Sequence, residues 1–297
     1  MTTFYRTLLG TIIYTIIIIL AAPFPSAAGL FLTFPALNGL GFFFSPPESI
    51  EPMTRSMLWM PVINGALCAA YIAAFLALRH VAAPTAVAWV LAIAVAGAWL
   101  AIASRKSVRG GIARKYQAAY GIVVVLAGCA LVAVGLHVLS GHAIGSGWSK
   151  YPVISHDFLL QILWSSKLKI ALFAACLLLF LMATARLPIS PGVRGILTGL
   201  PIVPFGGLLS VAADGGVDLG ERAHIFERMA TSVWLSPAIA VAFIYGYSTY
   251  LGSRQPPGTP DSGRVMKFAV LVAAWSLCGA AILGIAYVVA SLAQPAG

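Results

Sequence analysis

Gly29-Leu-Phe-Leu-Thr-Phe-Pro-Ala-Leu-Asn-Gly-Leu-Gly41 decides the fold, because a related stretch, Gly195-Ile-Leu-Thr-Gly-Leu-Pro-Ile-Val-Pro-Phe-Gly-Gly207, occurs later in the chain. The terminal glycines and the central proline of the first copy recur 166 positions later in the second (195 − 29, 201 − 35, 207 − 41). Pro25 and Pro191 keep the same separation. Both residue types are common in membrane helices, but four matches at one separation favour an internal duplication.

The repeat extends over a unit of four apolar segments. A polar loop with acidic residues follows each copy, and then a segment containing Trp59-Met-Pro61 in the first unit or Trp234-Leu-Ser-Pro237 in the second. We therefore expect a first repeat over residues 1–104 and a second over 165–297. Residues 105–164 between them would form a basic loop, one linking helix and an outer loop.

The composition predicts an all-α polytopic membrane protein. Of the 297 residues 60% are hydrophobic and only 9% are charged, whereas soluble domains carry about 25% charged residues. A membrane-spanning helix needs about 20 apolar residues. By that rule nine helices are expected, over residues 4–22, 27–44, 56–79, 84–104, 116–139, 165–187, 192–212, 229–251 and 265–291.

Two other classes of function are disfavoured. The net charge of +10 could indicate nucleic-acid binding, but the basic residues lie at the ends of apolar segments, where membrane topology places them. The four cysteines lie inside apolar segments without C-x-x-C spacing, so neither a disulfide framework nor a metal site is indicated. We expect no cofactor and no nucleic-acid partner.

The basic loops predict the orientation. Residues 105–115 contain five basic side chains, which places that loop in the cytoplasm by the positive-inside rule. The N-terminus is then cytoplasmic, in the inner (cytoplasmic) membrane, although Lys167 and Lys169 fall on the outer side. The fifth helix reverses the second unit relative to the first, as in transporters built from inverted repeats. Trp148, Tyr151 and Trp164 are expected along the outer interface.

The order of these features resembles the GlpM-type small four-helix inner-membrane proteins. The residues that carry the resemblance are Gly195, Leu200, Pro201, Asp214, Trp234, Ser236 and Pro237, and more loosely Gly29, Pro35, Trp59 and Pro61. The first unit lacks a serine before Pro61 and a clear partner for Asp214. The resemblance implies a fused duplication of a unit that elsewhere occurs singly, and it implies no substrate.

The candidate binding residues are uncharged. Proline frees backbone carbonyls within a helix, and prolines at matching places in two halves of a transporter point to its binding site. The substrate-binding candidates are Thr33, Pro35, Asn38, Trp59, Asn64, Thr198, Pro201, Ser210, Trp234 and Ser236. The simpler alternatives are that the prolines only permit close packing and that Asn64 only joins two helices.

The leading function is a transporter or flippase-like permease with a site between the two units near the bilayer midplane. A cavity without fixed charge would suit a neutral or amphiphilic small molecule or lipid-like substrate, or an anion held by helix ends. The alternative is a non-transporting scaffold that assists other membrane proteins of an export or polysaccharide machine. An integral membrane enzyme is a third possibility, although the chain contains none of the common catalytic motifs and offers no catalytic residues.

The orientation can be tested by labelling. A cysteine placed at Arg109 should react with a membrane-impermeant thiol reagent in inverted vesicles and remain unlabelled in intact cells. Labelling of that cysteine from outside intact cells would reverse the assignment.

Overall fold

The computed structural model describes residues 2–21, 23–80, 83–140, 156–186, 189–214, 218–254 and 263–292. These residues form fourteen helices and no strand. The first unit contains α1 (Thr2–Ala21), α2 (Pro25–Phe31), α3 (Ala36–Phe43), α4 (Pro47–Met57), α5 (Trp59–Leu78) and α6 (Pro84–Ala103). The short α7 (Lys106–Gly110) and the long α8 (Arg114–Ser140) link the units. The second unit contains α9 (His156–Arg186), α10 (Pro191–Thr198), α11 (Ile202–Ala212), α12 (Leu219–Ser232), α13 (Ser236–Arg254) and α14 (Arg264–Leu292).

The predicted all-α, multi-pass fold is confirmed. Among the described residues, eight helices are long and apolar enough to cross a membrane, or nine if α12 and α13, which meet at a 45° bend, form one span. The expected helices 27–44 and 192–212 are both broken in the middle, and the expected helix 229–251 starts in the last turn of α12 and crosses the bend into α13. The expected outer loop was too long, because α9 already begins at His156. Of its aromatic residues, Trp148 and Tyr151 lie outside the described residues.

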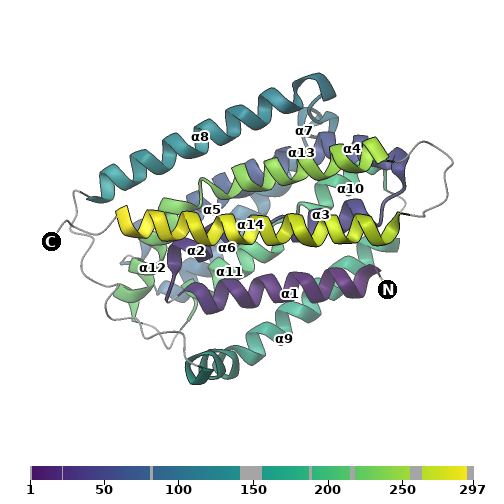
Figure 1. Ribbon diagram of the computed structural model, residues 1–297. Coiled ribbons are helices and arrows are strands. Elements are labelled where there is room, and N and C mark those ends of the chain that lie inside the picture. The colour runs from purple at the N-terminus through teal and green to yellow at the C-terminus, as the bar shows by residue number, and fades with distance from the viewer. Residues whose placement is uncertain are drawn as a thin grey trace.

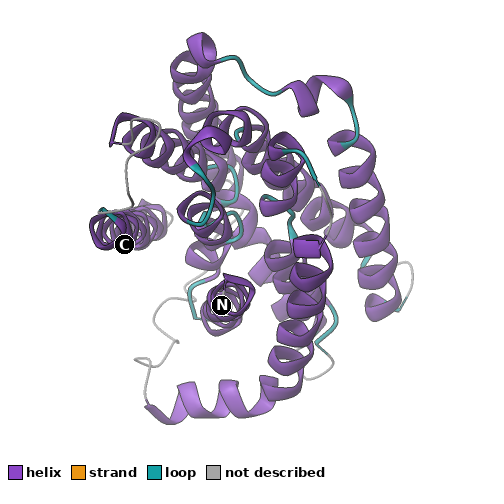
Figure 2. Ribbon diagram, turned by 90° about the vertical axis from the view of Figure 1, so that its right-hand side faces the viewer, coloured by secondary structure: helices purple, strands orange, loops and turns teal. Residues whose placement is uncertain are grey.

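The two broken spans lie in the middle of the bundle. Buried residues make up 83% of an 18-residue stretch within 25–43 and 61% of one within 191–212, against 11% within 265–285 and 17% within 114–134. Figure 2, which looks along the bundle, shows other helices surrounding the centre. The peripheral helices α8 and α14 expose apolar side chains, as lipid-facing helices do.

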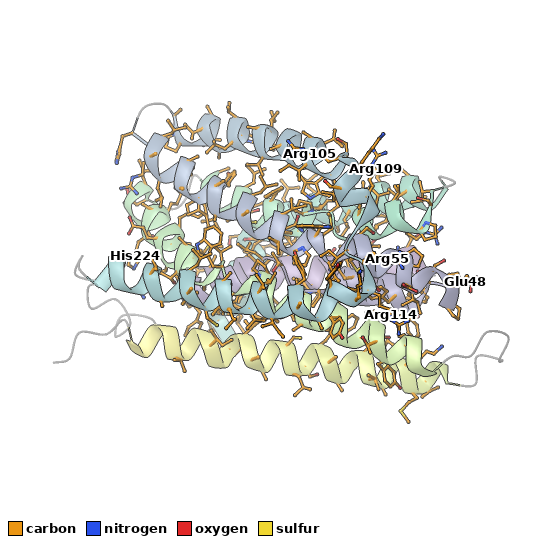
Figure 3. All side chains as sticks on the ribbon, turned by 90° about the horizontal axis from the view of Figure 1, so that it is seen from above. Glu48, Arg55, Arg105, Arg109, Arg114 and His224 are labelled. Carbon is orange, nitrogen blue, oxygen red and sulfur yellow. The ribbon has the colours of Figure 1, made fainter. Side chains whose placement is uncertain are left out.

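The two ends of the bundle differ in charge. We call the end with the starts of α1, α4 and α8 the N-terminal face, and the opposite end, where α5 finishes and α12 starts, the far face (Figure 1). Figure 3 shows Arg55, Arg105, Arg109 and Arg114 at the N-terminal face and His224 at the far face. On the far face, ion pairs join Arg79 to Glu227 at 3.7 Å and Lys169 to Asp214 at 2.8 Å.

The two units cross the bundle in opposite directions. In Figure 1, α1 runs from the N-terminal face to the far face, whereas α9 runs from the far face to the N-terminal face. The two helices pack against each other. Because α8 crosses the bundle once between them, α9 starts at the far face, where α1 ends.

Two helix pairs pack closely across the units, α2 with α12 and α10 with α4. In each pair, one helix comes from the first unit and the other from the second. A Cβ atom added at Gly29 would lie 2.7 Å from the backbone oxygen of Met229, and one added at Gly195 would lie 2.6 Å from that of Met53. Only glycine allows the backbones to approach so closely. A Cβ at Gly29 would also meet the side chain of Ser232, and one at Gly195 would meet that of Ser56. Ser232 and Ser56 are 176 positions apart, as are Pro237 and Pro61, whereas Trp234 and Trp59 are 175 apart.

These glycines should be essential for stability. Gly29→Ala and Gly195→Ala should each lower the free energy of unfolding by about 1–3 kcal/mol, because the new methyl group meets backbone that cannot move aside. Gly97→Ala is the matched control: Gly97 is exposed on α6 with no atom near its missing Cβ, and it should be neutral or slightly stabilising. Thermal unfolding in detergent measures all three. Equal melting temperatures for the three variants would contradict this account of the packing.

Candidate functional site

The two helix breaks have the same backbone geometry. Pro35 has φ −80° and ψ 35°, and Pro201 has φ −81° and ψ 40°, each immediately before the second half-helix. Proline has no N–H to continue the preceding helix and disfavours a helical residue before it. As a result, α2 ends at Phe31 and α10 at Thr198, and the chain resumes as α3 and α11. The two prolines thus create the breaks at matching positions in both units.

A small cavity of about 40 Å³ lies between the two breaks. It has room for one or a few water molecules. The lining residues come from α1, both breaks and the start of α5: Gly10, Ile13, Leu32, Thr33, Phe34, Ala36, Leu37, Asn38, Pro61, Asn64, Thr198, Gly199, Leu200, Val203 and Pro204. Of the predicted site residues, the structure brings Thr33, Asn38, Asn64 and Thr198 together here.

Asn64 ties α5 to the second break. Its Nδ2 donates a hydrogen bond to the backbone oxygen of Gly199 at 2.8 Å, and its Oδ1 accepts one from Trp99 Nε1 at 3.0 Å. Both side chains are buried. The proline break frees the Gly199 carbonyl, and Asn64 supplies the hydrogen bond that it would otherwise lack. This geometry fits the packing alternative for Asn64.

Ser236 serves the first break in the same way. Its hydroxyl donates to the backbone oxygen of Leu30 at 2.8 Å and accepts from the backbone N–H of Thr33 at 2.9 Å. The Thr33 hydroxyl also bonds to Ser236 Oγ. A serine hydroxyl can donate once and accept twice, so Ser236 is fully engaged, while Thr33 still presents its oxygen to the cavity.

Asn38 is different, because it is buried and has no hydrogen-bond partner among the described residues. Its side chain is 7% exposed and lines the cavity. A buried amide without a partner is costly, and amide groups in such places usually bond to water or to a ligand. Asn38 is therefore the side chain in this cavity that is best placed to contact a bound molecule.

Six of the predicted residues do not line the cavity: Ser236, described above, and five others. Pro35 and Pro201 shape it through the backbone. Trp59 packs against Tyr120 of α8 with ring centroids 5.4 Å apart, and Trp234 packs against the large apolar core. Ser210 bonds to the hydroxyl of Tyr14 on α1.

A larger vestibule of about 200 Å³ adjoins the cavity at the N-terminal face. It shares Leu37, Thr198 and Leu200 with the cavity, so the two are neighbours. Arg6 and Arg194 line the vestibule, and none of the described residues that line it is acidic. Neither arginine is among the site residues predicted from the sequence, because basic residues near the ends of helices were attributed to membrane orientation. The absence of a nearby acidic residue in the sequence around each was the available signal.

The far face has different residues at the positions that match the vestibule. Phe44 and Phe180 line the vestibule, and the residues 166 positions from them are Ser210 and Tyr14, which are hydrogen-bonded to each other. The Tyr14 ring is also stacked on Phe173, with centroids 4.0 Å apart and planes 6° from parallel. Two aromatic residues therefore line a vestibule at one face, whereas the residues at the matching positions contact each other toward the other face.

Comparisons of the chain with protein-family models, curated proteins and solved structures find no match. Within the described ranges, no group of three or more His, Cys, Asp or Glu side chains could hold a metal ion. The candidate site is therefore defined by its own geometry, as a polar cavity between two helix breaks of a multi-pass membrane protein.

Two asparagines should respond oppositely to truncation. Asn64→Ala leaves the Gly199 carbonyl and the Trp99 N–H unpaired and should lower the free energy of unfolding by about 1–3 kcal/mol for each unpaired group. Asn38→Ala removes an amide that has no protein partner and should leave stability unchanged or higher. Thermal unfolding in detergent checks both. A large loss of stability in Asn38→Ala would show that Asn38 has a structural role.

Proposed function

We propose that this protein is a transporter or flippase-like permease whose substrate binds between the two helix breaks. The observation that carries the proposal is the pair of proline breaks at matching positions, facing one cavity lined by Asn38, Thr33 and Thr198. In membranes, non-helical backbone persists only where protein buries it or where it lines a cavity. Broken helices paired across two repeats are the usual construction of a transport site.

The symmetric contacts support two inverted repeats. Exchanging the units converts the pair α2–α12 into α10–α4 and leaves the pairs α1–α9 and α5–α13 unchanged, and all four pairs are in contact. The contact of Gly29 with Met229 and Ser232 becomes that of Gly195 with Met53 and Ser56. A pseudo-two-fold axis in the membrane plane accounts for this correspondence, as it would for a fused duplication of a GlpM-type unit.

The unequal ends of the cavity support alternating access. One sequence repeat provides the same positions at both faces, yet Phe44 and Phe180 line a vestibule at one face, whereas Ser210 and Tyr14 are bonded to each other toward the other. If the first unit adopted the arrangement of the second, and the second that of the first, the far face would open and the N-terminal face would close. With the N-terminal face cytoplasmic in the inner membrane, the described conformation would be the inward-open one.

The proposal can be tested without knowing the substrate. In a variant whose four cysteines are replaced, a single cysteine at Asn38 should react with an impermeant thiol reagent added from either side of the membrane. Tyr14→Phe should raise the labelling rate from the far face about fivefold, because it removes a hydrogen bond of about 1 kcal/mol that holds that side closed. Vesicles of both orientations allow both rates to be measured.

A cysteine at Thr3 is the matched control, since Thr3 lines the vestibule at the N-terminal face, and it should be labelled from that face alone. If the cysteine at Asn38 is also labelled only from the N-terminal face, with or without Tyr14→Phe, the cavity has one fixed entrance. That result would reject the transporter and favour the scaffold.

A further inference from the structure

Two arginines converge on the vestibule from different units. Arg6 lies in the second turn of α1, and Arg194 is the fourth residue of α10. Each side chain is only partly exposed, and the two guanidinium groups are close enough to repel each other. Partly burying two like charges side by side opposes folding unless an opposite charge is present.

Neither guanidinium has a hydrogen-bond or ion-pair partner among the described residues. The Nε of Arg6 is buried and unpaired. By contrast, Arg55 on the same face pairs with Glu51 at 2.6 Å, and Arg79 on the far face pairs with Glu227. The vestibule therefore holds two positive charges that no described residue compensates.

The surroundings also favour an anion. The α11 helix starts at Ile202, at the inner end of the vestibule, and the N-terminus of a helix carries partial positive charge. The walls are otherwise apolar or carry hydroxyl groups, such as those of Thr3, Ser45 and Thr184. In such a partly desolvated setting, guanidinium groups bind oxyanions in a forked, two-bond geometry.

We propose that Arg6 and Arg194 together bind a phosphate group. A phosphate monoester carries nearly two negative charges at neutral pH, which matches the two arginines better than a single carboxylate does. The inference rests on the proposed function in one respect: the phosphate would belong to a substrate that enters the cavity from the vestibule. It could come from a water-soluble phosphate ester or from the headgroup of an anionic lipid.

The binding can be measured on the purified full-length protein in neutral detergent. Inorganic phosphate, titrated at constant ionic strength with chloride, should raise the unfolding temperature, since a ligand of the folded state stabilises it. Arg6→Gln and Arg194→Gln should each weaken the phosphate affinity about tenfold or more. Arg6→Lys should fall between the wild type and Arg6→Gln, because lysine keeps the charge but loses the fork. Arg55→Gln, on the same face but outside the vestibule, should leave the affinity within about twofold.

The unliganded variants separate binding from a structural role. Removing one of two repelling charges should leave the unfolding temperature of Arg6→Gln unchanged or higher without phosphate. A lower temperature with an intact phosphate response would mean that Arg6 is structural, and it would overturn the proposal. An equal response of the wild type and both glutamine variants would overturn it too.

Nanodiscs distinguish the two sources of phosphate. Stabilisation by inorganic phosphate in detergent indicates a water-soluble ligand. Stabilisation only in nanodiscs that contain phosphatidic acid, and not in pure phosphatidylcholine, indicates a lipid headgroup; no stabilisation in either case refutes the site. None of these measurements requires transport, so a failure here leaves the two-sided labelling at Asn38 as an independent test of the proposed function.

Discussion

The structure depends on the close approach of each broken helix to a helix of the other unit. Gly29 lies against the backbone of α12, and Gly195 lies against the backbone of α4. In a membrane, helices gain little from the hydrophobic effect when they associate, so tight packing of small residues supplies much of the attraction. Because both contacts join different units, neither unit has a complete core without the other. The breaks are held in the middle of the bundle by the same contacts.

Breaking a helix inside a membrane leaves backbone groups that must be satisfied. The two units meet this requirement differently. Ser236 bonds the backbone around Thr33, while at the equivalent place in the other half Met60 packs over Gly199 and Asn64 supplies the hydrogen bond. The two breaks thus share their backbone geometry, while the polar side chains that serve them differ. Asn38 is left as the side-chain amide in the cavity without a partner among the described residues.

The two faces are also unequal. Where the far face has Tyr14 and Ser210 bonded to each other, the N-terminal face has Phe180 and Phe44 around an open vestibule. The N-terminal face also carries Arg6 and Arg194, and the residues 166 positions from them are Leu172 and Ala28. The N-terminal face and the far face therefore differ in charge, in the vestibule and in hydrogen bonding, although a repeated sequence by itself would make them alike. This inequality gives the proposed transport cycle a defined starting conformation.

The sequence by itself determined the class of protein, the helices and the break positions. Long apolar runs with few charges can only be membrane helices, and Pro35 and Pro201 cannot continue a helix whatever surrounds them. That Thr33, Asn38, Asn64 and Thr198 line one cavity was also predictable, because they lie within about a turn of the breaks or opposite them. Only the tertiary structure decided which of the predicted polar side chains already have hydrogen-bond partners within the protein. Ser210 and Ser236 are engaged by partners about 200 positions away, and local sequence holds no trace of such distant contacts. The tertiary structure likewise decided that Arg6 and Arg194 meet, because two helices far apart in the chain must pack before their charges share one space.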